Sequence, residues 1–175
     1  MRKTSVKILI WGPGEGTNFY SKRDRIKQHL RDIGQYDEVN TSEDLFKSIE
    51  HPSFPDLVQL ELLHANVADI IFGLVTSDPR QTGIYMEIDN LLRYEPLINK
   101  TWLIMPDEHD WHKAGSFIQV PLLNSFPMYR TKSFRIKQLE KCEQVRKFCS
   151  DKVNETRARL MRNYVQKVLS GQDNS

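Results

Sequence analysis

Short apolar runs, each closed by a polar or glycine-bearing turn, recur along the chain and predict buried strands. They lie at residues 5–12, 69–76 and 100–106, with a weaker candidate in the segment YDEVNT. The run DIIFGLVT, at 69–76, is apolar almost throughout, as a central parallel strand covered on both faces is. The stretch SFIQVPLLNSFPMYR stays ambiguous, because two prolines interrupt its short strand-like runs.

Between these runs, apolar residues recur at the three- and four-residue spacing of an amphipathic helix. The predicted helices occupy residues 18–34, 56–68, 84–95 and 133–170, with a short one capped by Thr41 or Ser42. Gly34 suits the end of the first helix. The helix at 56–68 is apolar nearly all round, so we expect it to be largely buried.

The segment 133–170 predicts one long amphipathic helix or two. Its apolar stripe includes Leu139, Val145, Cys149, Val153, Leu160, Tyr164 and Val168. We therefore divide the chain into an α/β domain over 1–132 and a C-terminal helical extension over 133–175, which packs on that domain or mediates oligomerisation.

Strands that alternate with helices predict a parallel sheet with helices on both faces. In such sheets ligands bind beyond the carboxyl ends of the strands. Three loops would converge there, at 12–17, 76–83 and 107–115, and these loops are the richest in glycine and polar residues. The sequence therefore predicts a ligand site at that edge of the sheet.

Composition bounds the class of protein. A chain of 175 residues with 39% apolar residues is long enough for a hydrophobic core. The net charge is only +2, and acidic residues are interspersed with the basic ones even after residue 130. This pattern is typical of solvated helix faces, so we do not expect nucleic-acid binding.

The two cysteines, Cys142 and Cys149, fall in one predicted helix. Seven residues along a helix span about 10 Å, which is too far for a disulfide between them. This usage fits a reducing cytoplasm. The segment MRKTSVKILIWG is not a signal peptide, and no apolar run reaches the length of a transmembrane helix, so we expect a cytoplasmic protein that does not cross a membrane.

Glu87 is a carboxylate on the apolar side of its predicted helix. It shares a line with Ile84, Leu91 and Tyr94 at helical spacing. A negative charge near a helix N-terminus is stabilised by the helix dipole, which is one explanation of its place. The other is that Glu87 points into the ligand site, and the pattern leaves both open.

Glu61 is a second carboxylate in apolar surroundings, in line with Leu57, Val58, Ala65 and Ala68. A carboxylate among such neighbours is either paired, with His64 or a basic side chain, or faces a cavity. Because both predicted helices adjoin the strand at 69–76, Glu61 and Glu87 would flank one cleft. Two carboxylates in one partly apolar cleft can have their pKa values pushed apart, so that one serves as nucleophile and the other handles protons.

Two loops hold further candidates. The loop WGPGEGTNF lacks both the dinucleotide fingerprint and the P-loop lysine, yet Gly12, Gly14 and Gly16 would let backbone amides approach a ligand. A tight turn explains them equally well. The loop DEHDWHKAG gathers acids and histidines without metal-ligand spacing, so we expect no metal site, and its Trp111 would stack on a base or pack on the surface.

The order of these parts resembles the nucleoside 2-deoxyribosyltransferase-like family. The matching segments are the glycine-bearing loop after the first strand, then PDLVQLELLHANVADIIFGLV, TGIYMEIDNLL and KTWLIMPDEHDW. The chain is also similar to the deoxyribosyltransferase-like N-terminal domain of a retron antiphage effector, through SEDLF, VADIIFGLV, TGIYMEI and SFIQVPLL in the same order. The resemblance extends from about residue 5 to about residue 125.

The resemblance implies a flavodoxin-like three-layer α/β/α fold with a mostly parallel sheet, and cleavage of an N-glycosidic bond in a nucleoside, nucleotide or NAD-like molecule. Glu87 takes the family's catalytic position, and Glu61, eight residues before Asp69, takes that of an acid which orients the sugar or the base. The glycine loop would hold a phosphate or ribose. We also expect Asp78, Gly83 and Trp111 to contact the substrate. Gln81 stands where transferases of the family have an acid, which favours hydrolysis over base exchange.

Four hypotheses follow. The first is an N-glycosidase or transferase acting on a small nucleoside or nucleotide without a cofactor, in a homo-oligomer and with a role in phage defence. The second is a nucleotide-binding sensor without turnover. The third is a TIR-like NAD hydrolase, which also uses a Glu after a central strand. The fourth is an interaction module whose C-terminal helix pairs with a partner or with itself, and it requires Leu139, Val145 and Val153 to be exposed.

Overall fold

The computed structural model describes residues 4–14, 17, 20–47, 54–74, 94–106, 132–136 and 142–170. Its strands are β1 (Lys7–Trp11), β2 (Glu38–Thr41), β3 (Ile70–Leu74), β4 (Thr101–Pro106) and β5 (Lys132–Ile136). Its helices are α1 (Tyr20–Ile33), α2 (Ser42–Phe46), α3 (Phe54–Val67), α5 (Glu95–Lys100) and α7 (Cys142–Leu169).

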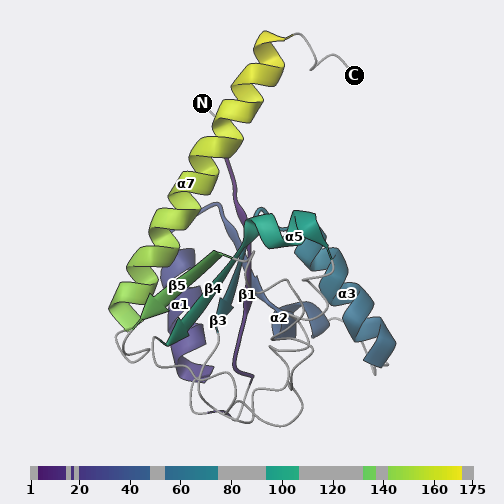
Figure 1. The fold of residues 1–175 in the computed structure, drawn as a ribbon, viewed down its shortest axis with the longest axis vertical. Coiled ribbons are helices and arrows are strands. Elements are labelled where there is room, and N and C mark those ends of the chain that lie inside the picture. The colour runs from purple at the N-terminus through teal and green to yellow at the C-terminus, as the bar shows by residue number, and fades with distance from the viewer. Residues whose placement is uncertain are drawn as a thin grey trace.

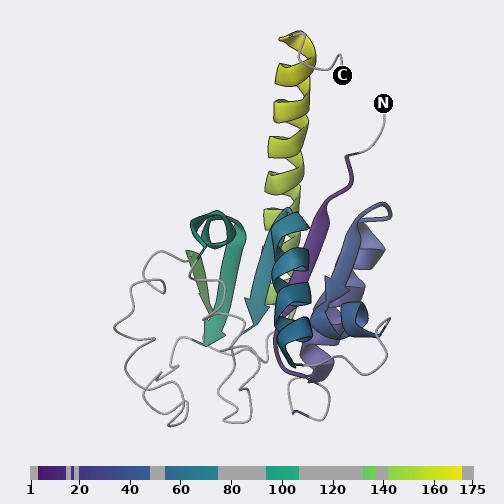
Figure 2. The ribbon, with the colours of Figure 1, turned by 90° about the vertical axis from the view of Figure 1, so that its right-hand side faces the viewer.

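The five strands form one parallel sheet in the order β2-β1-β3-β4-β5. Helices cover both faces, with α1 and α7 on one side and α2, α3 and α5 on the other (Figures 1 and 2). This strand order is the flavodoxin-like one. The fold class predicted from the sequence, a flavodoxin-like three-layer arrangement with a long C-terminal helix, is therefore confirmed.

Alternation along the strands explains why both faces are apolar. In β1, Ile8 and Ile10 point into a core shared with α1 and α7, while Leu9 and Trp11 point to the opposite face. Val145, Cys149 and Val153 of α7 are buried in the same core as Ile8, Ile10, Phe72 and Ile104. Cys149 is buried and forms no disulfide with a residue that the structure describes. The central strands β1 and β3 are thus covered on both faces, as the nearly continuous apolar sequence of β3 indicates.

Several helix predictions are confirmed in outline. Helix α1 ends at Ile33, and the Gly34 amide donates to the Leu30 carbonyl at 3.0 Å, so Gly34 stops the helix as its position predicts. Thr41 is the N-cap of α2, and its hydroxyl and the Asp44 carboxylate form a capping box.

Other predictions of local structure are wrong. Residues 132–136, which begin the segment predicted as helical, form strand β5, and the helix begins only at Cys142. The sequence pattern also missed the short helix α5. Helix α3 is not buried all round, because Leu63 and Val67 are exposed on one side. The division of the chain at residue 132 stays a prediction.

Helix α7 is longer than the sheet it covers and projects beyond it (Figure 1). Val145 and Val153 are buried, which removes the first half of the helix as a pairing surface, and Leu139 lies outside the described residues. Tyr164, Val165, Val168 and Leu169 in the projecting half are exposed. Within the described part of the chain, no helix combines the length and apolar character needed to cross a membrane.

Candidate functional site

The candidate site lies at the carboxyl end of β1, where the strand order changes direction. From β1 the chain passes through α1 to β2 on one side, whereas β3 pairs with β1 on the other. Such a switch point leaves a crevice beyond the strand ends, which is the usual ligand position in this class of sheet. Trp11 is the last residue of β1, and Gly12 begins the glycine-bearing loop.

Gly12 packs against the end of β3. A Cβ atom at Gly12 would lie only 3.0 Å from the Leu74 Cβ, which is closer than side chains normally approach. Glycine therefore lets the chain leave β1 tightly beside β3. After Gly14 the loop makes a turn, in which the Thr17 amide and hydroxyl both donate to the Gly14 carbonyl, at 3.3 and 2.8 Å.

Glu61, on α3, lies at this end of the sheet and is only 9% exposed. The indole Nε1–H of Trp11 and the hydroxyl of Ser42, the latter at 3.0 Å, both donate to its Oε1. The second oxygen, Oε2, is buried and has no hydrogen-bond partner among the residues that the structure describes. The carboxyl group is thus oriented through one oxygen, while the second oxygen is buried and its hydrogen-bonding capacity is unused by the described residues.

Burial raises the pKa of Glu61 to about 6, because desolvation disfavours the charged form. The hydrogen bonds from Trp11 and Ser42 oppose this rise, and the negative charge of Glu43 adds to it. A carboxyl group with this pKa exchanges a proton near neutral pH, as a general acid or base must.

Glu43 and Arg23 form the neighbouring part of the site. The guanidinium of Arg23, which is 2% exposed, lies with Nη1 at 2.7 Å from Oε1 of Glu43. Oε2 of Glu43 is buried and, within the described ranges, accepts no hydrogen bond. A Cβ atom at Gly14 would be 3.7 Å from Oε1 of Glu43, so this carboxylate lies beside the glycine loop. Two carboxylates, each with one buried oxygen that lacks a partner among the described residues, therefore lie near the start of the loop.

The structure places three of the candidate residues together: Glu61, Gly12 and Gly14. The remaining candidates, Gly16, Asp78, Gly83, Glu87 and Trp111, lie outside the described residues, as do His109 and His112. The juxtaposition of Glu61 with Glu87 therefore stays a prediction. Among the residues that the structure describes, Glu61 is paired neither with His64 nor with a basic side chain, and its hydrogen bonds there come from two neutral donors.

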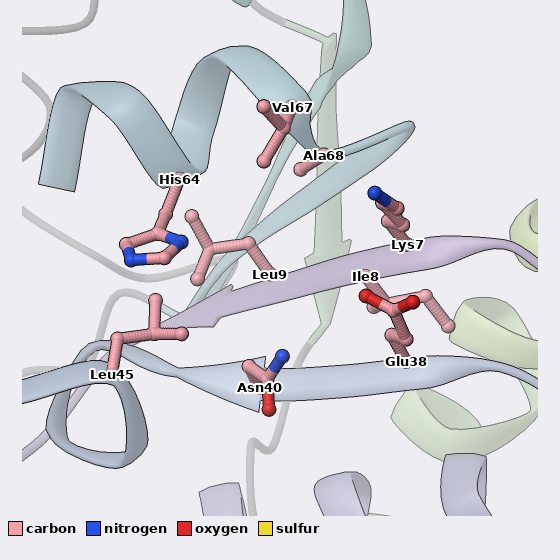
Figure 3. Close-up of a pocket in the computed structure, with 9 residues that line it drawn as sticks. All are labelled: Lys7, Ile8, Leu9, Glu38, Asn40, Leu45, His64, Val67 and Ala68. Carbon is pink, nitrogen blue, oxygen red and sulfur yellow. The ribbon is translucent and has the colours of Figure 1, made fainter. Parts of the chain in front are cut away.

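His64 instead lines a small pocket near the edge of the sheet. Figure 3 shows its ring above Leu9 and Leu45, with Lys7 and Glu38 further along the strands. Desolvation lowers the pKa of His64 below its usual value, so the ring is neutral near pH 7. This pocket is mostly apolar, and Glu61 does not line it.

The sequence analysis missed four members of the site: Trp11, Arg23, Ser42 and Glu43. Trp11 alternates with Ile10 and so faces the α3 side of the sheet, a signal that was present in the pattern. Ser42 and Glu43 follow the N-cap of α2, and a polar helix start directly after a strand is typical of the carboxyl edge of a parallel sheet. Arg23 gave no signal, because it resembles the other basic residues of its helix.

Comparisons with known proteins support the fold. No family model and no curated protein matches the chain. The IL-17 receptor B SEFIR domain superposes with a TM-score of 0.54 at 14% identity, over 87% of this chain and 97% of that chain. The 2-deoxyribosyltransferase of the psychrotolerant bacterium Bacillus psychrosaccharolyticus superposes with a TM-score of 0.52 at 20% identity, over 78% of this chain and 90% of that chain. At these identities the likeness shows a shared fold.

Proposed function

We propose that the chain cleaves or transfers the N-glycosidic bond of a nucleoside, nucleotide or NAD-like molecule at the carboxyl end of β1. The observation that carries this proposal is the buried carboxyl group of Glu61, which is fixed through one oxygen and has no partner for the other among the described residues. The similarity of fold to a 2-deoxyribosyltransferase supports the choice of reaction.

Glu61 would accept a hydrogen bond from a sugar hydroxyl or an amino group of the base through its buried Oε2, which lacks a partner among the described residues. Trp11 and Ser42 hold the other oxygen, so the carboxyl group is oriented before the substrate arrives. Glu43, with its charge compensated by Arg23, would offer beside the loop a second buried oxygen that lacks a partner in the described part of the chain. Sugar rings carry adjacent hydroxyl donors, which two such oxygens would bind together.

The resemblance to the deoxyribosyltransferase-like family assigns the nucleophile to Glu87. Its carboxylate would attack the anomeric carbon as the bond to the base breaks, and the base would leave with the electron pair and take up a proton. Water would then attack the same carbon, give up a proton and release the sugar and Glu87. Gln81 in place of the acid of the transferases supports water as the acceptor. A role in phage defence rests on the same resemblance.

Product release tests the proposal. The protein is incubated with nucleosides, deoxynucleotides and NAD, and free base or nicotinamide is measured by chromatography. We expect Glu87→Gln to abolish release and Glu61→Gln to lower kcat/KM by about a hundredfold or more, the usual contribution of a positioned acid or base. Glu95→Gln, which changes an exposed carboxylate at the start of α5, is the matched control and should leave the rate unchanged. Release that persists unchanged in both site variants contradicts the proposal.

The similarity to a receptor domain favours a second candidate, a nucleotide-binding sensor without turnover, or alternatively a TIR-like NAD hydrolase. Ligand-dependent stabilisation that requires Glu61, without release of a base, would identify the sensor. Release of nicotinamide from NAD alone would identify the hydrolase. The same incubation therefore separates all three functions.

A further inference from the structure

A second pocket lies at the opposite edge of the sheet, where the strands begin. It has a volume of about 180 Å³ and lies between the end of α5, the start of β4 and one face of α7. Figure 1 shows this end of the sheet, beyond which α7 projects, with α5 on the other side of the sheet. Glu61 lies at the carboxyl ends of the strands, so a ligand in this pocket would not contact the substrate site.

Basic side chains dominate the pocket. Lys100, Lys152, Arg159 and Arg162 line it, against two carboxylates, Asp69 and Glu155. Glu155 is paired with Lys152 at 2.8 Å, and Oδ2 of Asp69 accepts the Lys7 amide at 2.8 Å. Arg159 and Arg162 have no acidic partner in the part of the chain that the structure describes. The pocket thus carries four cations against two carboxylates, and two of the cations are guanidinium groups of one helix.

The walls around these cations are fixed by packing. The Lys100 ammonium donates to the carbonyls of Asn66 and Ala68, each at 2.7 Å, and so caps the C-terminal end of α3. The ammonium of Lys152 lies 4.9 Å from the centre of the Trp102 ring, and that ring packs edge-to-face on Phe148 with centroids 5.3 Å apart. Such a wall keeps its shape when an anion enters or leaves.

We propose that this pocket binds a phosphate group, with Arg159 and Arg162 as its principal donors. Planar guanidinium groups bind phosphate oxygens through paired hydrogen bonds, and two of them match a dianion. The pocket is smaller than the 300–1,000 Å³ that is usual for whole ligands, so it accommodates a phosphate or diphosphate group rather than an entire nucleotide. The Thr156 hydroxyl on the same helix face adds a neutral donor.

Calorimetric titration tests this site. Inorganic phosphate, pyrophosphate and ADP are titrated into the full chain at constant ionic strength. We expect the double variant Arg159→Gln/Arg162→Gln to weaken binding at least tenfold, which corresponds to about 1.4 kcal/mol. The matched control is Lys147→Gln/Lys167→Gln, which removes two exposed charges of α7 outside the pocket and should change the affinity less than twofold.

The outcomes separate the alternatives. Equal binding of pyrophosphate and ADP would show that the phosphates alone are recognised, and tighter binding of ADP would show that the group is carried on a nucleoside. An equal loss in both double variants, absence of binding, or preference for a single-stranded oligonucleotide over every small phosphate would overturn the proposal. Because Glu61→Gln leaves this pocket intact, the result is independent of the proposed glycosidase activity.

Discussion

The carboxyl group of Glu61 has its pKa raised to about 6 by the surroundings in which the fold places it, first by burial and then by the charge of Glu43. In the unfolded chain the pKa of the same carboxyl group is near its ordinary value of 4.5. Between these two values the folded protein binds more protons than the unfolded chain, so its stability falls as the pH rises from about 4.5 to about 6. Above about pH 6 the raised pKa of Glu61 therefore lowers the free energy of unfolding by about 2 kcal/mol.

Replacing Glu61 with Gln should therefore stabilise the protein at neutral pH while it impairs the proposed activity. The amide oxygen of Gln can still accept from Trp11 and Ser42, and no charge remains to be desolvated. We expect the free energy of unfolding, measured in urea, to rise by up to about 2 kcal/mol at pH 7.5 and to change little at pH 4.5. Glu95→Gln should show no such pH dependence. A Glu61→Gln variant less stable than wild type at pH 7.5 would show that the ionised carboxylate is stabilising.

At the scale of elements, the sequence predicts best where a long segment carries one clear period. The apolar runs of β1, β3 and β4 and the helical spacing of α1 and α3 identify these elements directly. Strand β5 has only five residues, KSFRI, in a stretch whose apolar residues also fit a helix, and α5 has only six. Such short segments do not distinguish the two periods, so their structure depends on tertiary pairing.

The site was predictable only in part, for a related reason. Glu61 stands out because a charge interrupts an apolar line of one helix. Its partners come from other elements: Trp11 is 50 residues away in the sequence and Ser42 is 19 residues away. No local pattern links them, because the contact exists only once β1, α2 and α3 are placed around the sheet edge.

Helix α7 shows how element length limits what a pattern can predict. A helix of 28 residues is about 42 Å long, whereas a five-residue strand spans about 17 Å. The apolar stripe continues along the helix, but the sheet covers only its first part. Val145, Cys149 and Val153 are therefore buried, and Tyr164 and Val168 are exposed.

The two halves of α7 should accordingly respond differently to truncation of an apolar side chain. Val153→Ala removes buried methyl groups and leaves a cavity, so we expect a loss of about 2 kcal/mol in the free energy of unfolding. Val168→Ala, the same change on the exposed half, should cost less than about 0.5 kcal/mol. Urea unfolding at a low protein concentration measures both. A comparable loss in Val168→Ala would indicate that the projecting half is covered in solution, as the predicted homo-oligomer requires.

On the scale of the whole molecule, the two edges of the sheet carry opposite chemistry. The carboxyl ends of the strands lie near the buried oxygens of Glu43 and Glu61 that lack partners among the described residues, while the amino ends lie near the guanidinium groups of Arg159 and Arg162. A net charge of only +2 conceals this segregation. The carboxyl ends of the strands suit ligands with hydroxyl or amino donors, and the amino ends suit anions. The two ends of the sheet are therefore suited to different ligands.

Arg157 connects the projecting helix to the body of the molecule. Its guanidinium donates to Oδ2 of Asp37, which lies in the turn between α1 and β2 with a side chain only 3% exposed. The other oxygen of Asp37 accepts the amide of Val6 at 3.0 Å. Asp37 therefore joins the start of β1, the turn after α1 and the middle of α7, and Arg157 compensates its buried charge.

Arg157→Ala should destabilise the whole fold, because it leaves the Asp37 carboxylate buried without its cation. We expect a loss of about 3 kcal/mol in the free energy of unfolding at pH 7, whereas Arg162→Ala, an exposed arginine of the same helix, should change it by less than about 0.5 kcal/mol. Asp37→Asn combined with Arg157→Ala removes both charges and should recover part of the loss. If the double variant is no more stable than Arg157→Ala alone, the buried charge is not the source of the cost, and the packing of the arginine stem accounts for it instead.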